Sequence, residues 1–332
     1  MTEKDFRMNQ PLIADIKRGS LEDGPGIRSV VFFKGCPLQC IFCHNPETQS
    51  PFVEIAFSEK DCIRCGQCKE VCPEDAIALH PQIPSPLTGE GQGGGERRPS
   101  FENRINRTKC TRCGKCTLVC PGQGLRSIGR YYEVEQLTEI LMRDITFYRY
   151  SGGGVTLSGG ECTMYPDYLE ELLISLKANN INTMLETSGY FDYNTFKEKI
   201  LPYIDVIYYD VKIADEDDHK MFTGRSNKKI LDNLRRLIKE EDVQVIPRVP
   251  LIPGITATQK NLSAIVNILR GIGAENISLL PYNPMGMSIY TCLGREMPPL
   301  PDSFMKPDEE EEVYEMFREI LEGKMAENTT RR

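Results

Sequence analysis

The sequence lacks any apolar run that approaches the ~18 residues needed for a helix to span a membrane. The segment from Met1 to Gln10 is polar and contains no signal-peptide core. An excess of positive charge is also missing, because 40 lysines and arginines stand against 48 aspartates and glutamates, for a net charge of −8. This balance argues against a nucleic-acid-binding protein. We therefore expect a globular protein of the cytoplasm that binds neither membrane nor nucleic acid.

A disulfide framework is not expected either, although the 332 residues include 13 cysteines. Twelve of them precede position 163, and eleven of those fall in spacings typical of metal ligands. Such thiols need a reducing compartment. The length, with a hydrophobic fraction of 40%, supports one large domain with an insert.

A short loop after the apolar run Val30 to Phe33 carries Cys36, Cys40 and Cys43 at C-x3-C-x2-C spacing. An iron–sulfur cube has four irons and each protein thiolate holds one, so three cysteines leave one iron free for a substrate or cofactor. Structural zinc is the alternative, but zinc sites close with a fourth cysteine or histidine. The adjacent His44 would be strained in reaching the same ion. The loop therefore favours an open cluster at which chemistry occurs.

Two near-copies of the C-x2-C-x2-C-x3-C-P motif of bacterial ferredoxins follow the loop. In this pattern three cysteines of one run hold a cube and the fourth ligates the other cube. Two zinc ribbons are the alternative, but the eight cysteines match the ferredoxin pattern without a gap. Closed cubes carry electrons or stabilise the fold instead of binding substrate. The expected ligand sets are Cys62, Cys65, Cys68 and Cys120 for one cube, and Cys110, Cys113, Cys116 and Cys72 for the other.

Between the two motifs, Ile83 to Ser100 is rich in glycine, proline and serine and is expected to be a flexible, dispensable loop. From Tyr131 onward, helical and strand-like patterns alternate, which predicts a parallel sheet that right-handed crossovers curl into a partial barrel. The expected strands are Val30–Phe33, Val155–Leu157, Asn182–Leu185, Val206–Tyr209, Val243–Ile246 and Ile277–Leu280. The expected helices are Tyr132–Tyr150, Tyr168–Ala178, Thr195–Ile200, Lys228–Lys239, Leu262–Gly271 and Asp308–Leu321, with a frayed end at Met325–Arg332.

Before the first of these strands, Leu12 to Arg28 reads as a polar lead and a turn, Asp23-Gly24-Pro25-Gly26. Its glycines are expected to let the backbone pass close to the cluster. The cluster loop itself follows the first strand, at the end where parallel α/β barrels place their active sites.

The three-cysteine loop resembles that of the radical S-adenosylmethionine (SAM) superfamily, in which it holds a [4Fe–4S] cluster and SAM binds the unique iron. The flanking segments Leu21–Arg28 and Cys43–Glu47 are similar to those of the glycyl-radical enzyme activating enzymes. The resemblance extends from Ile16 to about Gly323, except for residues 81–108. It implies an α/β fold, a partial (β/α)6 radical-SAM barrel formed by residues 12–52 and 131–324, with a ferredoxin-like two-cluster insert at 53–130.

Polar motifs end several predicted strands and suit the charged amino-acid end of SAM. Ser158–Glu161 offers bare backbone and a carboxylate for an amino group, Asp210 and Lys212 share one side of a strand, and Arg248 suits a carboxylate. Asn283 stands where several relatives have histidine, and it can still hydrogen-bond. The resemblance implies SAM contacts at Phe42, His44, Gly159, Gly160, Glu161, Ser188, Asp210, Val211, Lys212, Arg248 and Asn283.

Three other thiol or imidazole side chains receive no role. Cys162 is expected to be an inert, packed thiol. His80 and His219 are isolated in the sequence and are expected to face solvent.

The resemblance implies a radical SAM oxidoreductase with three [4Fe–4S] clusters. It would cleave SAM reductively to a 5′-deoxyadenosyl radical and remove hydrogen from a backbone glycine of a partner glycyl-radical enzyme, with electrons from a flavodoxin or ferredoxin-type protein. No acid, base or nucleophile of the chain is required, since the cofactor supplies the chemistry. The alternatives are a radical SAM enzyme acting on a small molecule and a ferredoxin-like electron carrier. The open iron argues against the carrier, and the insert argues against the short activase of anaerobic ribonucleotide reductase.

Overall fold

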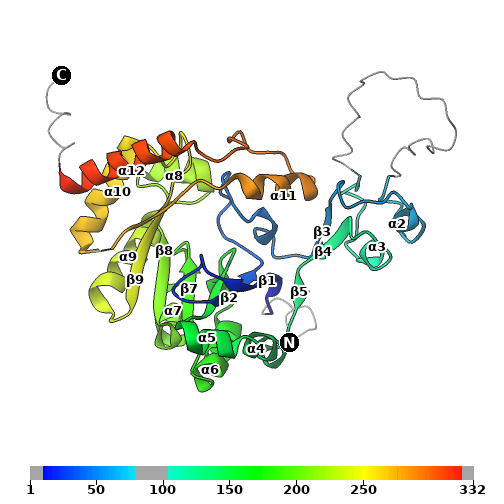
Figure 1. Cartoon of the computed structure of the whole chain (residues 1–332), viewed down its shortest axis with the longest axis horizontal. Helices are drawn as coiled ribbons and strands as arrows, with labels where there is room; N and C mark the ends of the chain where they lie inside the picture. The colour runs from blue at the N-terminus through cyan, green and yellow to red at the C-terminus, as the bar shows by residue number, and fades with distance from the viewer. Residues whose placement is uncertain (1–9, 79–103, 275, 324–332) are drawn as a thin grey trace. The chain divides into compact units, whose positions relative to one another are not determined.

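The computed structural model describes residues 10–78, 104–274 and 276–323. The chain divides into two compact units (Figure 1). The first unit comprises Met1–Phe52, Gly129–Met287 and Pro298–Arg332, and the second comprises Val53–Ile128 and Ser288–Met297. The predicted flexible loop Ile83–Ser100, His80 and the terminal segment Met325–Arg332 lie outside the described residues.

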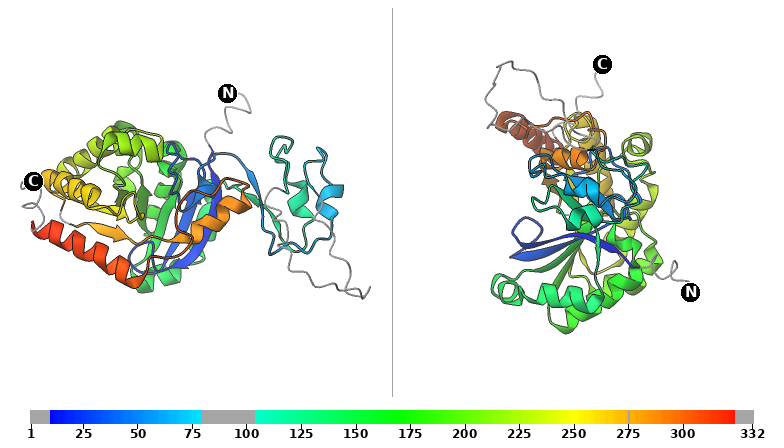
Figure 2. Two further views of the ribbon diagram at one scale, coloured as in Figure 1. Left: turned by 90° about the horizontal axis from the view of Figure 1, so that it is seen from above. Right: turned by 90° about the vertical axis from the view of Figure 1, so that its right-hand side faces the viewer.

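The first unit is built on an eight-stranded sheet in the order β10-β9-β8-β7-β6-β2-β1-β5. Its neighbours from β2 to β10 are all parallel and follow one another along the chain, with helices in the connections (Figures 1 and 2). The fold is therefore α/β, a partial barrel of six parallel strands, and all six predicted strands are confirmed. They are β2 (Arg28–Phe33), β6 (Gly154–Gly159), β7 (Asn182–Thr187), β8 (Val206–Asp210), β9 (Gln244–Pro250) and β10 (Ser278–Leu280).

The two antiparallel strands that extend this sheet beyond β2 were not predicted. The polar lead forms strand β1 (Leu12–Ser20), which pairs antiparallel with β2 and with the short strand β5 (Arg130–Tyr131). Leu12 and Ile13 are buried, whereas the lysine and arginine that follow are exposed. Beyond these two residues, Ile16 is the one apolar side chain of β1 that packs against the main core, so the apolar signal is too weak to indicate a strand.

The predicted helix Tyr132–Tyr150 is wrong, because the structure has two helices there, α4 (Val134–Met142) and α5 (Ile145–Ser151). Asp144 lies between them, and its carboxylate accepts hydrogen bonds from Arg18 Nε at 2.7 Å and Ser29 Oγ at 2.8 Å. Because Asp144 bonds these distant residues, it interrupts the helix. The helical spacing of apolar residues in the sequence does not reveal such partners.

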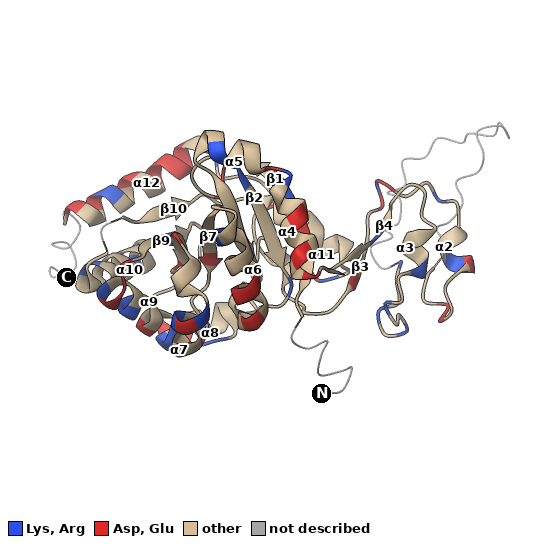
Figure 3. Ribbon diagram, turned by 90° about the horizontal axis from the view of Figure 1, so that it is seen from below, with Lys and Arg blue, Asp and Glu red and all other residues tan. Residues whose placement is uncertain are grey.

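The other predicted helices are present, with boundaries shifted by a few residues. Charged side chains cover their outer surfaces, as Figure 3 shows for α12, while Val313, Phe317 and Ile320 on the same helix are buried. Helix α8 (Glu216–Thr223) was not predicted. The confirmed helices are α6 (Pro166–Ala178), α7 (Tyr193–Lys199), α9 (Lys228–Glu240), α10 (Gln259–Ile272) and α12 (Pro307–Glu322).

The glycines of the turn before β2 serve a purpose different from the expected one. Gly26 has φ = 72°, and a Cβ on it would lie 2.4 Å from the backbone nitrogen of Gly153, which precedes β6. The turn therefore packs at the amino ends of the strands, whereas the cluster loop follows their carboxyl ends. Next to it, the fully buried Arg28 donates to Thr156 Oγ1 at 2.7 Å and to Val155 O at 2.9 Å, which ties β2 to β6.

Replacing Gly154 tests how tightly the amino ends of β6 and β7 pack against each other. Its Cβ would lie 2.0 Å from the carbonyl oxygen of Asn182 on β7, so we expect Gly154→Ala to lower the midpoint of thermal unfolding by several degrees. Overpacking of this kind costs about 1–3 kcal/mol or more. Gly271→Ala in α10 is the matched control, because nothing lies within 4 Å of its Cβ position. The control should be neutral or slightly stabilising, and equal melting of the two variants would contradict the packing argument.

The second unit has a small apolar core around its cysteines. Strands β3 (Glu54–Phe57) and β4 (Leu125–Ile128) pair antiparallel, and the short helices α2 (Gln67–Glu70) and α3 (Lys115–Leu118) each carry one cysteine. The core consists of Ile55, Phe57, Cys68, Ile77, Ile105, Cys116 and Leu125.

A segment from far along the chain, Ser288–Met297, also belongs to the second unit and includes most of α11 (Met287–Cys292). Arg295 Nη2 lies 2.6 Å from Glu54 Oε1, and Arg107 Nη2 donates to the carbonyl oxygen of Cys292 at 3.3 Å. The sequence did not predict this association. Across both units, no helix within the described part of the chain is long and apolar enough to cross a membrane.

Candidate functional site

The predicted site residues of the first unit lie together at the carboxyl ends of the parallel strands. The cysteine loop follows β2, Gly159 ends β6, Thr187 ends β7, Asp210 ends β8, and Arg248 lies two residues before the end of β9. These are the carboxyl ends of the strands, where parallel α/β folds place their active sites. The topology therefore brings together motifs that are more than 200 residues apart in the sequence.

The loop that carries the three cysteines is part of a small buried cluster. Cys40 and Phe42 are buried, and Cys36 and Cys43 pack against the same group, which includes Ile213 and other apolar residues. Burial raises the pKa of all three thiols, to about 12 for Cys43. Three sulfur donors beside a cluster of apolar residues are the donor set for a cube held through three of its irons, so the residues present fit an open [4Fe–4S] cluster.

Backbone hydrogen bonds hold this loop from two sides. On one side, Gly35 N donates to Thr48 O at 2.7 Å. On the other side, Gln39 N donates to Thr223 O at 2.8 Å and Ile41 N donates to Phe222 O at 3.0 Å, at the end of α8. The loop conformation is therefore set by the surrounding fold, independently of any side-chain contact between the cysteines.

His219 helps to shape the segment that contacts the loop. The expectation that it faces solvent is wrong, since its side chain is 1% exposed. Its Nδ1 lies 2.7 Å from the carbonyl oxygen of Arg225 and 3.0 Å from Thr223 Oγ1. Arg225 in turn donates through Nε to the carbonyl oxygen of Pro37 at 3.0 Å, so the histidine supports the cysteine loop through its neighbours.

Four charged side chains form a network at the ends of β7, β8 and β9. Arg248 lies 2.5 Å from Glu186 Oε1 and 3.0 Å from Asp210 Oδ1, and Lys212 Nζ lies 2.8 Å from Asp210 Oδ2. The side chains of Asp210 and Lys212 are only 19% and 15% exposed, so the two charges form a largely buried ion pair. Ser158 on β6 donates to Glu186 Oε2 at 2.6 Å and extends the network across one more strand.

The register of the sheet explains why these residues meet. Asp210 is paired with Arg248 along β8 and β9, and Glu186 on β7 is paired with Tyr208 on β8. Glu186 was not among the predicted site residues. Its position at the carboxyl end of a predicted strand was the available signal.

The network is electrostatically coupled to the cysteine loop. Burial by itself raises the pKa of Asp210, but Lys212 and Arg248 outweigh it and hold the pKa below its ordinary value. Burial opposes the charge of Lys212, but Asp210 and Cys40 raise its pKa above the ordinary value. Fixed charges of both signs next to the cysteines fit the amino and carboxylate groups of SAM.

The glycine turn after β6 lies directly against the cysteine loop. Gly160 N donates to Phe33 O at 2.9 Å, and Glu161 N donates to Gly35 O at 2.8 Å. A Cβ on Gly160 would lie 2.2 Å from the carbonyl oxygen of Gly35. The absence of a side chain is therefore required for the close approach of two backbones.

The carboxylate of Glu161 is used inside the protein, which differs from the expectation that it meets an amino group of SAM. Its side chain is fully buried. Its oxygens accept hydrogen bonds from Thr163 Oγ1 at 2.7 Å, from Thr187 Oγ1 at 2.9 Å and from Ser188 N at 2.9 Å. Ser188 Oγ also donates to it, at 2.5 Å. Glu161 and Ser188 thus join the ends of β6 and β7.

The remaining predicted contacts fall into two groups. The side chains of His44 and Asn283 are hydrogen-bonded to each other and exposed, and Asn283 Oδ1 also accepts from Met285 N at 2.9 Å. Phe42 and Val211 are buried, with Val211 in the main core of the first unit. Cys162 is fully buried in the same core, in keeping with a packed thiol.

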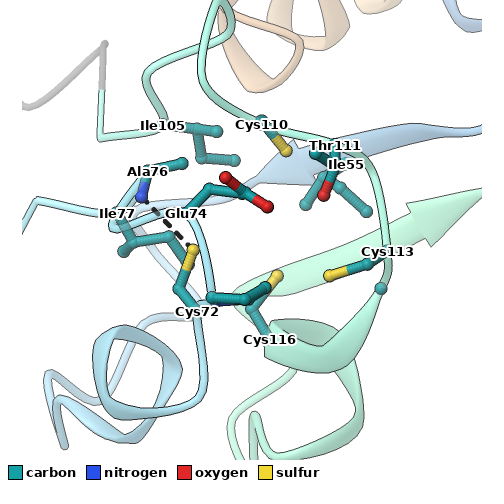
Figure 4. A pocket seen from close by; sticks show the side chains of 12 residues that line it. Ile55, Cys72, Glu74, Ala76, Ile77, Ile105, Cys110, Thr111, Cys113 and Cys116 are labelled. Carbon is teal, nitrogen blue, oxygen red and sulfur yellow. Dashed lines mark hydrogen bonds between the residues drawn. The ribbon is translucent and has the colours of Figure 1, made fainter.

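The second unit brings together the four cysteines of one ferredoxin-type quartet. Cys72, Cys110, Cys113 and Cys116 line one pocket (Figure 4). Ala76 N donates to Cys72 Sγ at 3.2 Å. Cysteine sulfurs from both motifs thus face one cavity, as a ferredoxin cube requires.

Two cysteines of the other quartet contact a buried arginine. Arg104 Nη1 lies 2.7 Å from Cys62 Sγ and its Nη2 lies 3.2 Å from Cys68 Sγ, while Leu125 N donates to Cys120 Sγ at 3.4 Å. Several donors aimed at sulfur fit cysteines that act as thiolate ligands. Arg104 was not recognised from the sequence, where it stands outside both cysteine motifs.

The chain is similar to known iron–sulfur and radical SAM proteins. Three family models match the chain: the 4Fe-4S single cluster domain at residues 22–70, the 4Fe-4S dicluster domain at residues 54–121 and the radical SAM superfamily at residues 107–261. The chain is 35% identical to the trans-4-hydroxy-L-proline dehydratase activating enzyme of Clostridioides difficile, covering 92% of this chain and 96% of that one.

Two further relatives serve other chemistries. The choline trimethylamine-lyase activating enzyme of Oleidesulfovibrio alaskensis is 38% identical, covering 86% of this chain and 88% of its own. The benzylsuccinate synthase activating enzyme of Thauera aromatica is 36% identical, covering 87% and 83%.

Proposed function

This chain belongs to the glycyl-radical enzyme activating enzymes of the radical SAM superfamily, and from that membership we propose how its residues divide the work. We propose three [4Fe–4S] clusters. The first is held by Cys36, Cys40 and Cys43 with SAM on its open iron, and the other two are held by the ferredoxin-type quartets. The observation that supports the first assignment most strongly is the position of Cys40, which is buried, and of Cys36 and Cys43, which are partly buried, beside the charged network.

The enzyme is an oxidoreductase that contains iron–sulfur clusters and uses SAM. The bound cofactor supplies the chemistry: reductive cleavage of SAM gives a 5′-deoxyadenosyl radical, which takes a hydrogen atom from a backbone glycine of a partner glycyl-radical enzyme. The chain's own residues bind and orient SAM and exclude water, and none of them has to act as an acid or base.

We propose that the amino-acid end of SAM binds at the charged network at the ends of β7, β8 and β9. Asp210 presents a carboxylate to a cationic group, and Arg248 and Lys212 present cations to a carboxylate. His44 and Asn283, which are exposed and joined to each other, are suited to the polar ribose and adenine atoms. Glu161 and Ser188 hold the glycine turn against the cysteine loop, so their contribution is to position it.

We further propose an electron donor, a cellular compartment and a class of client enzyme. A flavodoxin or a ferredoxin-type protein would supply electrons, and the two quartets of the second unit would relay or store them. A reducing cytoplasm would keep eleven ligand thiols available. The relatives are named for a dehydratase, a lyase and a synthase, so we expect a client from these classes of glycyl-radical enzyme or from the decarboxylases.

The test is anaerobic reconstitution with iron and sulfide, reduction with dithionite and addition of SAM. We expect 5′-deoxyadenosine, together with a glycyl radical signal in electron paramagnetic resonance that requires a glycyl-radical enzyme encoded nearby. Deoxyadenosine without a radical on any such partner would move the substrate to a small molecule. A fully clustered protein that forms no deoxyadenosine would instead support an electron carrier.

A further inference from the structure

We propose that Arg104 gives the two ferredoxin-type clusters different reduction potentials. It would make the cluster of Cys62, Cys65, Cys68 and Cys120 easier to reduce than the cluster of the other quartet. The inference rests on the proposed ligand sets, and it concerns where an electron resides once it has entered the second unit.

The position of Arg104 carries the argument. Its side chain is 2% exposed, and it directs one guanidinium nitrogen at each of two sulfurs, Cys62 Sγ at 2.7 Å and Cys68 Sγ at 3.2 Å. Two further contacts hold the group in place: Nε donates to Ala78 O at 3.1 Å, and the guanidinium lies 5.2 Å from the centre of the Phe57 ring. The charge is therefore fixed at the sulfurs and shielded from water.

The other quartet has a different environment. Its sulfur Cys72 Sγ receives a neutral backbone N–H, from Ala76. Arg107 is electrostatically coupled to Cys110, but its guanidinium donates to the carbonyl oxygens of Ile55 and Cys292 instead of to sulfur. The other cations nearby in sequence are exposed, so water and salt screen them; they are Lys109, Arg112 and Lys115.

This asymmetry has a predictable effect on redox equilibrium. One-electron reduction adds a negative charge to a cluster and its thiolates, and a cation that donates to those sulfurs stabilises the reduced state more than the oxidised state. Hydrogen bonds from a charged donor are roughly twice as strong as neutral ones. Net charge and hydrogen bonds to sulfur are among the factors that set cluster potentials. An electron in the second unit should therefore reside mainly on the cluster beside Arg104.

The experiment uses the full chain with Cys36, Cys40 and Cys43 replaced by alanine, so that only the ferredoxin-type clusters remain. The reconstituted protein is titrated with dithionite under redox control and followed by electron paramagnetic resonance. In Arg104→Gln we expect the ratio of reduced to oxidised cluster at a fixed potential to fall about tenfold, equivalent to about 59 mV for one electron. The other cluster should not change.

Three further variants sharpen the result. Arg104→Lys keeps the charge but loses the two-pronged geometry, so the same cluster should shift in the same direction by a smaller amount. Arg126→Gln removes an exposed arginine of the same unit and should leave both potentials unchanged. Cys65→Ser alters one ligand of the first quartet and identifies which signal belongs to it.

The outcomes separate this inference from the proposed function. Unchanged potentials in fully loaded Arg104→Gln, an equal shift of both clusters, or a shift of the other cluster would overturn the role of Arg104. If the glutamine variant loads poorly, the lysine variant decides by the same criteria. If the parent with the three alanines binds no iron, the ligand sets themselves are wrong.

Discussion

Replacing Cys40 with alanine is expected to reduce SAM cleavage by more than about a hundredfold, because the proposed open cluster would lose one of its three protein ligands. Changes to groups that merely support a metal ligand already cost about 10–100-fold, so loss of the ligand itself should cost more. The measurement is 5′-deoxyadenosine formed per protein after anaerobic reconstitution and reduction. Iron content should fall by about one third, because two of three proposed clusters remain.

The matched control for this variant is Cys162→Ala. Cys162 is fully buried in the main core and lies outside the cluster of residues around the cysteine loop. Its replacement removes a packed thiol, so we expect full iron content and nearly unchanged SAM cleavage, with only a modest loss of stability. Substantial deoxyadenosine from Cys40→Ala would refute the three-cysteine mechanism, and equal loss in both variants would indicate a folding effect.

Replacing Arg248 with methionine should be strongly destabilising at neutral pH. Glu186 and Asp210, whose side chains are only 12% and 19% exposed, would lose the cation that lies between them, and breaking a buried ion pair from one side costs about 3–5 kcal/mol. For a unit of this size, the unfolding midpoint should fall by about 6–20 °C. Differential scanning fluorimetry of the cluster-loaded protein under anaerobic conditions would measure the shift.

The pH dependence of this loss distinguishes an electrostatic cause from a packing cause. The pKa of Asp210 is held below its ordinary value in the folded protein, so its stabilising contribution is present above the ordinary pKa, about 4, and is lost as the pH falls further. Without Arg248, the pKa of Asp210 should rise, and protonation on acidification would relieve the repulsion from Glu186. The difference in midpoint between the native protein and the variant should therefore be smaller at pH 5.5 than at pH 7.5.

Two other variants test the same network. Arg248→Lys retains the charge but not the two-pronged geometry, so it should lie between the native protein and the methionine variant. Lys260→Met removes one member of an exposed ion pair with Asp218 and should leave the midpoint nearly unchanged. A loss in Arg248→Met that is independent of pH would show that packing dominates.

Much of the fold could be predicted from the sequence because each parallel strand has a local sequence pattern. The six parallel strands are short apolar runs bounded by turns, and their order in the sheet follows the order in the chain. Antiparallel β1 could not be predicted, since few of its side chains are apolar and pack against the core. The break between α4 and α5 depends on Asp144, whose partners Arg18 and Ser29 are remote in sequence.

The candidate site divides in the same way. The sequence by itself was enough to propose the ligand sets, because most of the thiols that bind a cluster come from neighbouring residues and the spacing of the cysteines reflects the geometry of the cluster. It also indicated Asp210, Lys212 and Arg248, which end adjacent strands. Which of these charges meet each other depended on strand register, a property of the assembled sheet.

Only the tertiary structure decided how several polar groups are used. It joined Glu186 to Arg248, turned the carboxylate of Glu161 to Ser188, and placed Arg104 against two sulfurs. It also added Ser288–Met297 to the second unit. These partners are separated by dozens to hundreds of residues, so no local pattern encodes them. A buried polar group takes the partner that the packed fold brings within hydrogen-bonding distance, because leaving it unpaired is costly.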